Sequence, residues 1–330
     1  MHSPLVSIVV PSKNQGRFLR ETIESCLSQD YRPIEVLVID GASTDETLEV
    51  LHRYDRVPEV RWISEPDGGV GEAVNKGVAG AKGEIGASQS SDDYYLPGAI
   101  SRGVEALQAD PALGFVFGDV MKVDARGRRL SAETLAPFSI ENVMALRTWI
   151  PQPSCFFRLA LARGLGGWRG EVPYAADTDL WFRMMLKAGA LKIDACLAAR
   201  RVHGAQRDGR GADIIRDYTR AVNDWFDRFG APERYRNAAE AGVLLQRNHY
   251  GAGEPESVKR DRHARALRLF PPLRPPRRGA IGLALAAWRR CLRRPQAGQD
   301  ADGNARGMSR NDSGLKRADE LRNTDDDRRS

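Results

Sequence analysis

Short runs of β-branched residues alternate with helical patterns along the first 120 residues of this chain. The run Ile-Glu-Val-Leu-Val-Ile-Asp at 34–40, for example, is followed from about residue 45 by apolar residues at helical spacing. This alternation predicts a parallel sheet whose faces are covered by helices. We predict strands at 6–10, 34–40, 60–64, 84–87 and 114–123, and helices at 18–27, 45–54, 70–81 and 97–107.

The pattern becomes helical toward the C-terminus. Prolines and glycines interrupt 131–170, and a helix at 178–187 precedes a pair of strands around 191–202. Further helices are predicted at 214–229, 233–250 and 258–269. We therefore expect a helical extension over 211–270, a basic Pro/Arg-rich segment with a short amphipathic stretch over 271–295, and a disordered polar tail over 296–330.

Composition excludes several classes of protein. Hydrophobic residues make up 42% and charged residues 28% of the 330, an ordinary globular mixture that rules out a wholly disordered or fibrous chain. No apolar run approaches the roughly 20 residues that span a bilayer. The first residues lack a basic leader, and the four cysteines show no metal-binding or disulfide spacing. We expect a cytoplasmic protein.

The positive charge is concentrated near the C-terminus. Residues 256–295 carry twelve Lys and Arg against two acids. A nucleic-acid partner is disfavoured because no recognition motif or aromatic platform accompanies these charges. Peripheral association with an anionic membrane, through the apolar stretch 281–288 and its flanking arginines, stays open beside a simple solvated basic helix.

Acidic residues follow two of the predicted strands. Asp40 closes one strand, and Ser43 and Glu46 have the spacing of a helix-capping box. Asp92 and Asp93 follow another strand, where one acid is enough to cap the next helix. Ligands bind at the carboxyl edge of such sheets, where Asp40 can accept hydrogen bonds from a ribose or base, and paired acids can hold Mg²⁺ or Mn²⁺. The capping and ligand-binding interpretations both stay open.

Two further segments carry chemistry. Asp177 and Asp179 open an amphipathic helix after a glycine-rich stretch, and capping explains only one of them. Burial beside aromatic residues can raise the pKa of a carboxyl group, which suits it to act as a general base. His203 follows a predicted strand and precedes a basic loop of the kind that closes over an anionic leaving group, although most such histidines are ordinary surface residues.

Together these phrases resemble the family 2 inverting glycosyltransferases of the glycosyltransferase-A fold, in particular bacterial enzymes of surface-polysaccharide assembly. The resemblance covers roughly residues 4–210, in the family's order. Its phrases are VSIVVPSKNQGRFLRETIESCLSQDYRPIEVLVIDGASTDET, SEPDGGVGEAVNKGVAGAKGEI, SSDDYYLPGAI, IPQPSCFFR, YAADTDLW and RVHG. It implies an α/β fold with a Rossmann-like, mostly parallel sheet in a catalytic domain over 1–210, followed by the helical extension.

The resemblance also implies a role for individual residues. Those implied to bind the nucleotide are Pro11, Asn14, Asp40, Asp67, Asn75 and Asp92. Those implied to bind the metal, with the donor's diphosphate, are Asp92, Asp93 and His203, and the implied catalytic base is Asp177. One departure is Ser90, which stands where the family's metal motif often begins with Asp or Asn.

The expected activity is metal-dependent transfer of a sugar, with inversion, from a nucleotide sugar (we expect a uridine nucleotide) to a saccharide or lipid-linked acceptor. The alternative is a non-catalytic relative that binds a nucleotide sugar or a glycan on the same scaffold. Retention of Asp92, Asp93 and Asp177 favours the enzyme, whereas Ser90 favours the binding protein. A nucleotidyltransferase is disfavoured because no glycine-rich activating loop follows the first strand.

Overall fold

The computed structural model describes residues 3–133, 135, 137–204 and 209–273. Most of the segment 271–295, with its stretch 281–288, and the predicted tail 296–330 lie outside this range.

Within the described residues the strands are β1 (Val6–Ser12), β2 (Ile34–Asp40), β3 (Val60–Ser64), β4 (Ile85–Ser88), β5 (Tyr94–Tyr95), β6 (Leu113–Val123), β7 (Arg129–Glu133), β8 (Cys155–Arg158) and β9 (Gly189–Arg201). The helices are α1 (Gly16–Leu27), α2 (Thr47–His52), α3 (Val70–Gly80), α4 (Ala99–Ala109), α5 (Ile140–Met144), α6 (Leu159–Gly164), α7 (Ala176–Met185), α8 (Gly211–Asp227), α9 (Arg236–Tyr250) and α10 (Glu256–Leu269).

The described strands form one mixed sheet in the order β3-β2-β1-β4-β8-β6-β9-β5, with β7 paired to β6. Strands β1 to β4 run parallel, as the sequence predicts, and β6 is also parallel to β9. Strand β8 runs antiparallel between β4 and β6 and joins the two halves of the sheet. The α/β architecture with a mostly parallel, helix-flanked sheet is therefore confirmed.

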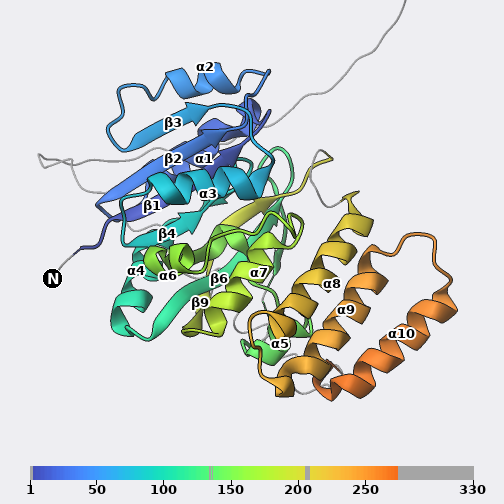
Figure 1. Ribbon diagram of the computed structural model, residues 1–330. Helices are drawn as coiled ribbons and strands as arrows, with labels where there is room; N and C mark the ends of the chain where they lie inside the picture. The colour runs from blue at the N-terminus through green and yellow to red at the C-terminus, as the bar shows by residue number, and fades with distance from the viewer. Residues whose placement is uncertain (1–2, 134, 136, 205–208, 274–330) are drawn as a thin grey trace, which may run out of the picture. The chain divides into compact units, whose positions relative to one another are not determined.

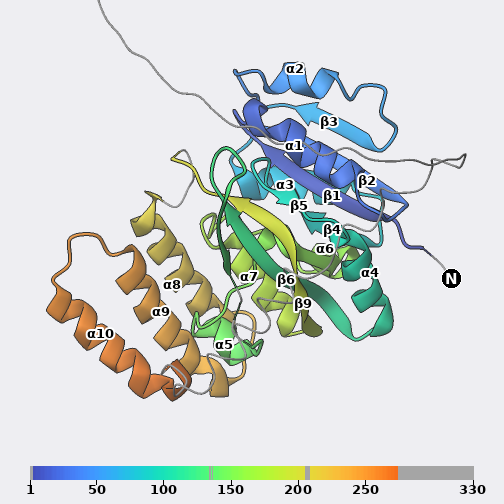
Figure 2. The ribbon, with the colours of Figure 1, turned by 180° about the vertical axis from the view of Figure 1, so that it is seen from behind.

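Alternating side chains along β1 divide the core into two layers. Val6, Ile8 and Val10 pack with α1, α2 and α4 on one face (Figure 2). Val9 faces the other way and packs with α3, α6 and α7 (Figure 1). This alternation follows from the two-residue period of a strand. The parallel pairing of β1 to β4 places their carboxyl ends at one common edge.

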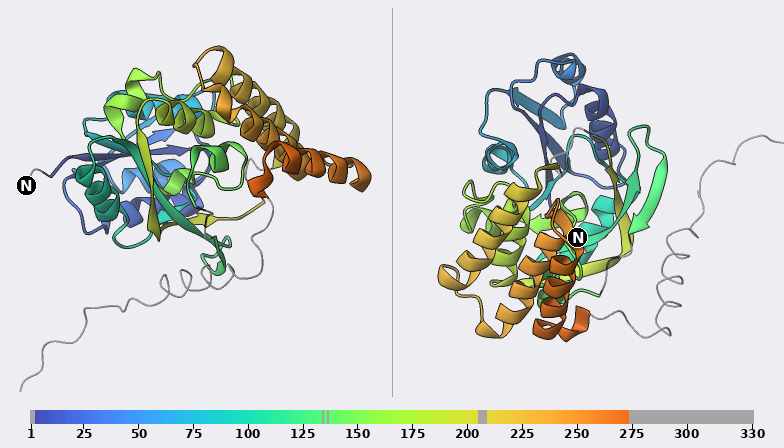
Figure 3. Two further views of the ribbon diagram at one scale, coloured as in Figure 1. Left: turned by 90° about the horizontal axis from the view of Figure 1, so that it is seen from below. Right: turned by 90° about the vertical axis from the view of Figure 1, so that its right-hand side faces the viewer.

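The C-terminal helices continue the second layer. Helices α8, α9 and α10 lie beside one another (Figure 3), and α8 contributes Tyr218 and Trp225 to the core that contains α7. Trp225 stacks on Phe182 of α7 with ring centroids 4.1 Å apart. The hydrophobic core thus continues across the predicted boundary at residue 210, and a division of the chain there stays a prediction. None of the described helices is long and apolar enough to cross a membrane.

Three local predictions differ from the structure. The first strand continues through Pro11, which β1 tolerates because β4 pairs only as far as Val9 on that side. The predicted pair of strands around 191–202 is one long strand, β9, whose irregular register with β6 absorbs the bends. The predicted capping box is also absent: α2 begins after Glu46, and Ser43 bonds to residues outside the helix.

Candidate active site

A cavity of about 420 Å³ opens at the carboxyl edge of the parallel strands. Its walls come from the end of β1 and the residues after it, the approach to α3 and its first turn, and the turn after β4. Gln152 and Arg200 complete it from the other half of the sheet. The predicted residues that line this cavity are Pro11, Asp67, Asp92 and Asp93. The sheet therefore brings segments far apart in sequence to one site.

Strand β9 holds the acidic turn in place. Asp93 is 4% exposed, and one of its carboxylate oxygens accepts a hydrogen bond from the backbone N–H of Arg201 at 2.7 Å. The Arg201 side chain donates through Nε to the carbonyl of Asp92 at 2.8 Å. Burial first, and the adjacent charge of Asp92 second, raise the pKa of the Asp93 carboxyl well above its ordinary value. The turn thus holds a carboxylate in a place where its negative charge is costly.

The acidic turn suits a hard divalent cation. Magnesium and manganese take one or two carboxylates and complete their shell with water and phosphate oxygens, and a cation here would offset the unfavourable charge on Asp93. The described residues contain no group of three or more His, Cys, Asp or Glu placed to hold a metal ion. Lys13 and Arg200 also line the cavity, and the Oγ of Ser12 is buried there with no hydrogen-bond partner among the described residues. These features fit a metal–diphosphate ligand.

His203 reaches this cluster through Asp92. Its Nε2 lies 2.9 Å from a carboxylate oxygen of Asp92, and its ring packs against Phe18 with centroids 4.9 Å apart. The histidine therefore lies beside the candidate metal residues, in contact with one of them. Most of the basic loop that follows lies outside the described residues.

Asp40 and Asn14 stabilise the loops behind the cavity. Asp40 is completely buried, and its carboxylate accepts hydrogen bonds from Ser43 and from the hydroxyl of Ser64, the latter at 2.6 Å. The side-chain oxygen of Asn14 accepts from the backbone N–H of Thr44 at 2.8 Å. Neither residue is among those that line the cavity, so their role toward a nucleotide stays a prediction.

Asp67 and Asn75 occupy different places. Asp67 lines the cavity and closely approaches Gly41, where an added Cβ would lie 2.7 Å from the carboxylate. Asn75, on α3, points to Trp168 instead: its amide donates to the Trp168 carbonyl at 2.7 Å and accepts from the Trp168 N–H at 2.9 Å. The structure thus separates two residues that share one sequence motif.

A second pocket of about 180 Å³ contains Asp177, the predicted base. It shares Val70 and Gln152 with the first cavity, so the two adjoin. Asp177 lies in the first turn of α7, and Ile214 of α8 forms part of the same wall. Burial, and secondly the charge of Asp177, raise the pKa of the Cys155 thiol well above its ordinary value, which argues against Cys155 as a nucleophile.

Sequence reasoning missed several residues of the site, four of them polar or charged residues at the acidic turn and the main cavity. Lys13, Gln152 and Arg200 line the main cavity, and Arg201 organises the acidic turn from a buried position. Each lies at or next to the end of a strand, or within one of the sequence phrases that resemble the family. This position is the sequence feature that could have identified them. Charge and size alone gave no reason to single them out.

The sequence of this chain matches the family model described as Glycosyl transferase family 2 over residues 7–165. Residues 7–165 belong to glycosyl transferase family 2. The predicted recognition is thereby confirmed for the part of the chain that contains the sheet edge and the acidic turn. Asp177 and His203 lie beyond the matched residues.

One similar protein is the chondroitin synthase of Escherichia coli, which is 28% identical over 234 residues. That alignment covers 69% of this chain and 33% of the synthase. The chain spans about a third of the length of several of the curated relatives it matches. The aligned region is therefore shared with proteins that are much longer.

Solved structures confirm the fold. Staphylococcus aureus TarS, in complex with UDP-GlcNAc, matches with a TM-score of 0.59 at 16% identity, over 84% of this chain and 92% of that one. The mannosyltransferase PcManGT of Pyrobaculum calidifontis, in complex with GDP-Man and Mn²⁺, matches with a TM-score of 0.59 at 22% identity, over 89% and 88%. The chain has the glycosyltransferase-A type of fold.

Proposed function

We propose that this protein transfers a sugar from a nucleoside diphosphate sugar to an acceptor hydroxyl, with inversion at the anomeric carbon. The observation that carries the proposal is the pair of adjoining cavities. Asp92 and Asp93 line one, Asp177 lines the other, and Val70 and Gln152 belong to both. A sugar that spans the shared wall has its diphosphate on one side and an acceptor on the other.

The donor side handles the leaving group. Asp92 and Asp93 would hold Mg²⁺ or Mn²⁺, which when bound supplies positive charge against the departing nucleoside diphosphate. Lys13 and Arg200 add two further cations to the same cavity. The buried Oγ of Ser12 offers a hydrogen bond to a phosphate oxygen. His203 orients Asp92 through its 2.9 Å contact.

On the other side, Asp177 acts as the general base. Its carboxylate removes the proton from the acceptor hydroxyl as the oxygen attacks the anomeric carbon, opposite the leaving phosphate. One displacement from that side inverts the configuration. A positioned base of this kind contributes about 10²–10⁴-fold to the rate. The wall of the second pocket includes two aromatic residues, Trp168 and Tyr174, which suit the less polar face of a sugar ring.

For the substrates, we propose a uridine nucleotide sugar and a saccharide or lipid-linked acceptor in cell-surface polysaccharide synthesis. A UDP-GlcNAc complex among the similar structures supports the first, and a chondroitin synthase among the relatives supports the second. We further propose that the protein acts in the cytoplasm, at the inner face of the membrane, with the basic residues of α10 such as Arg260 and Arg265 near anionic lipid. Liposome flotation at two salt concentrations tests that location.

Ligand-induced stabilisation tests the donor. The melting temperature is measured with UDP, GDP, UDP-GlcNAc and GDP-mannose, each with Mn²⁺ and with EDTA. A ligand that binds only the native protein raises this temperature. We expect the uridine compounds to do so with Mn²⁺ and to lose the effect in EDTA. Release of UDP on addition of acceptor polysaccharides then measures transfer, and binding without turnover would favour the non-catalytic relative.

A further inference from the structure

A glycine-rich loop, residues 165–175, joins α6 to the first turn of α7. It supplies Trp168, Pro173 and Tyr174 to the pocket of Asp177. A loop of this composition has few conformational restraints of its own, and Gly167 adopts a positive φ of 65°. The position of the base therefore depends on what holds this loop.

A buried ion pair within α7 holds the start of the loop. Asp179 is completely buried, and one of its carboxylate oxygens accepts from Nε of Arg183 at 2.8 Å. Arg183 uses its other two nitrogens to donate to the carbonyls of Leu165 and Gly167, each at 2.6 Å. The guanidinium of Arg183, six residues after the predicted base, thus fixes two backbone groups of the loop.

Helix α8 holds the other end. Arg169, within the loop, donates to the second oxygen of Asp179 at 3.1 Å and forms an ion pair with Asp224 of α8. Asp217, two helical turns before Asp224, accepts a hydrogen bond from the N–H of Tyr174 at 2.9 Å. The same face of α8 therefore contacts the loop at both acids.

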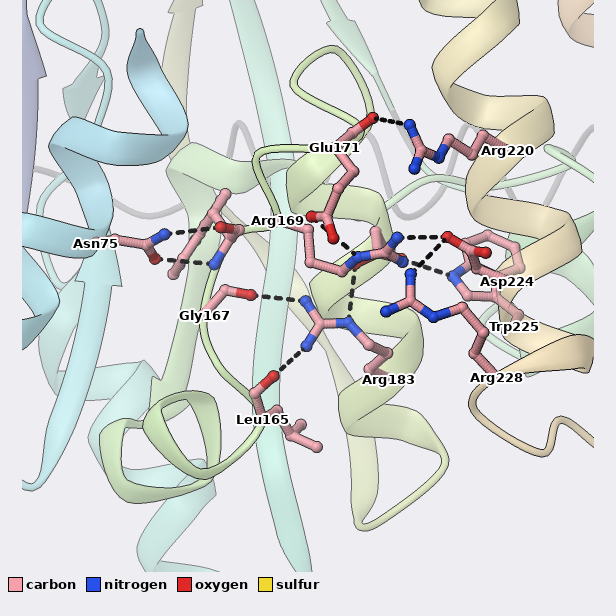
Figure 4. Close-up of polar contacts among 12 residues, drawn as sticks. Asn75, Leu165, Gly167, Arg169, Glu171, Arg183, Arg220, Asp224, Trp225 and Arg228 are labelled. Carbon is pink, nitrogen blue, oxygen red and sulfur yellow. Dashed lines mark hydrogen bonds and ion pairs between the residues drawn. The ribbon is translucent and has the colours of Figure 1, made fainter. Parts of the chain in front are cut away.

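The far side of the loop is tied to α3. Asn75 makes the two hydrogen bonds to Trp168 described above, and a Cβ at Gly167 would lie only 2.3 Å from the Asn75 side-chain oxygen. Figure 4 shows Asn75 on one side of the loop, Arg183 donating to Leu165 and Gly167, and Arg169 paired with Asp224 on the other side. Helix α3 begins at Val70, which belongs to both cavities.

Burial of so many charges is poorly explained by stability alone, because buried ion pairs are often no more stabilising than apolar residues of the same size. The loop and the first turn of α7 receive nearly all of these hydrogen bonds. We propose that Arg169, Asp179, Arg183 and Asp224 form a positioning network, which holds the 165–175 loop and α7 so that Asp177 faces the acceptor. The inference rests on the proposed function, and it makes α8 part of the machinery of transfer.

The substitution Asp224→Asn tests the network, because Asp224 is partly exposed and the amide retains its shape. Three quantities are measured on the whole chain: hydrogen exchange of the backbone, the affinity for UDP with Mn²⁺, and kcat and KM for transfer. We expect faster exchange in residues 165–180, UDP affinity within about two-fold of wild type, and a fall in kcat of about 10–100-fold, since small misplacements of a reacting group are costly. Asp224→Glu, which restores the charge, should recover part of kcat.

The matched control is Asp227→Asn, the same substitution on the exposed side of the same helix. It should leave all three quantities unchanged. Unaltered exchange in 165–180 for Asp224→Asn, unaltered kcat, or an equal loss of UDP affinity and kcat, would each overturn the network. Failure of the proposed function is distinct: the wild-type protein would then bind no UDP and transfer no sugar, whereas the exchange measurement would still report on the loop.

Discussion

The two sides of the candidate site are held by different means. On the donor side, the acidic turn is fixed mainly by the backbone: β5 pairs with β9, the backbone N–H of Arg201 reaches Asp93, and one side-chain bond runs from Arg201 to the Asp92 carbonyl. On the acceptor side, the loop before α7 is fixed by side chains, chiefly the ion pairs of Arg169 and Arg183 with Asp179. Backbone pairing tolerates many substitutions, whereas a side-chain network depends on each member.

This difference predicts how the sides respond to change. Substitutions on the donor side should alter binding of the metal and nucleotide and leave the architecture intact. Substitutions on the acceptor side should alter turnover while nucleotide binding persists. The following experiments separate these two responses.

Asp177→Asn should give the largest loss. Removal of the base should lower transfer by about 10²–10⁴-fold, because the acceptor hydroxyl no longer has a proton acceptor. UDP should still bind with Mn²⁺, since Asp177 lines only the second pocket. Initial rates and calorimetric titration with UDP measure the two effects, and Asp227→Asn is the control. Wild-type turnover in Asp177→Asn would remove this residue from catalysis.

Asp93→Asn should have the opposite effect on nucleotide binding from Asp177→Asn. Binding of UDP with Mn²⁺ should be lost, and the metal-free protein should become more stable. The sign follows from the pKa: burial, and then Asp92, raise it in the folded state, so folding favours the protonated acid. Stability of the wild type in EDTA should therefore fall as pH rises above about 4, the unfolded pKa, through the folded pKa.

Urea unfolding of both proteins in EDTA, at pH 5 and pH 8, measures this. The wild type should lose more stability between the two pH values than Asp93→Asn, which lacks the titrating group. An equal loss of stability in the two proteins would mean that ionisation of Asp93 does not destabilise the folded state. Retained Mn²⁺-dependent UDP binding in the variant would exclude Asp93 as a ligand.

The difference between the donor side, which is held by the sheet, and the acceptor side, which is held by side chains, also explains what the sequence could predict. The parallel strands and the acidic residues at their ends follow from local periodicity, and β2 and β3 have the predicted bounds. The placement of Asn75 did not follow, because its motif neighbour Asp67 faces the cavity while Asn75 contacts Trp168, which is 93 residues away. The capping box also misled, since Ser43 has the spacing of a cap and its hydroxyl contacts Asp40.

The helical region beyond residue 210 illustrates the same limit. The sequence predicts a helix at 214–229, within a helical extension of the domain, and the structure has α8 there. Periodicity does not reveal that Asp217 and Asp224 contact loop residues 43 and 55 positions earlier, because these contacts depend on tertiary packing. The sequence pattern thus predicts the helix, and the fold shows what the helix contacts.

Asn75→Ala should have an intermediate effect. It removes both hydrogen bonds to Trp168, and the unsatisfied backbone groups should cost about 1–3 kcal/mol of stability. If Asn75 holds the loop, the acceptor KM should rise and the affinity for UDP should not change. Asn223→Ala, at an exposed position of α8, is the control. A loss of UDP affinity would instead support the role that the family resemblance implies for Asn75.

Ser90→Asp should have the smallest effect, and it should be confined to the donor side. Ser90 lines the main cavity, and an acid there adds one more oxygen ligand beside Asp92. The gain in Mn²⁺ affinity should be about two- to five-fold, because a partly solvated charge contributes less than about 1 kcal/mol. Calorimetric titration of Mn²⁺ with saturating UDP measures it. The acceptor KM should stay constant, since the network that holds Asp177 does not include this turn. A change in acceptor KM with unaltered metal affinity would show that the two sides are coupled and that the comparison fails.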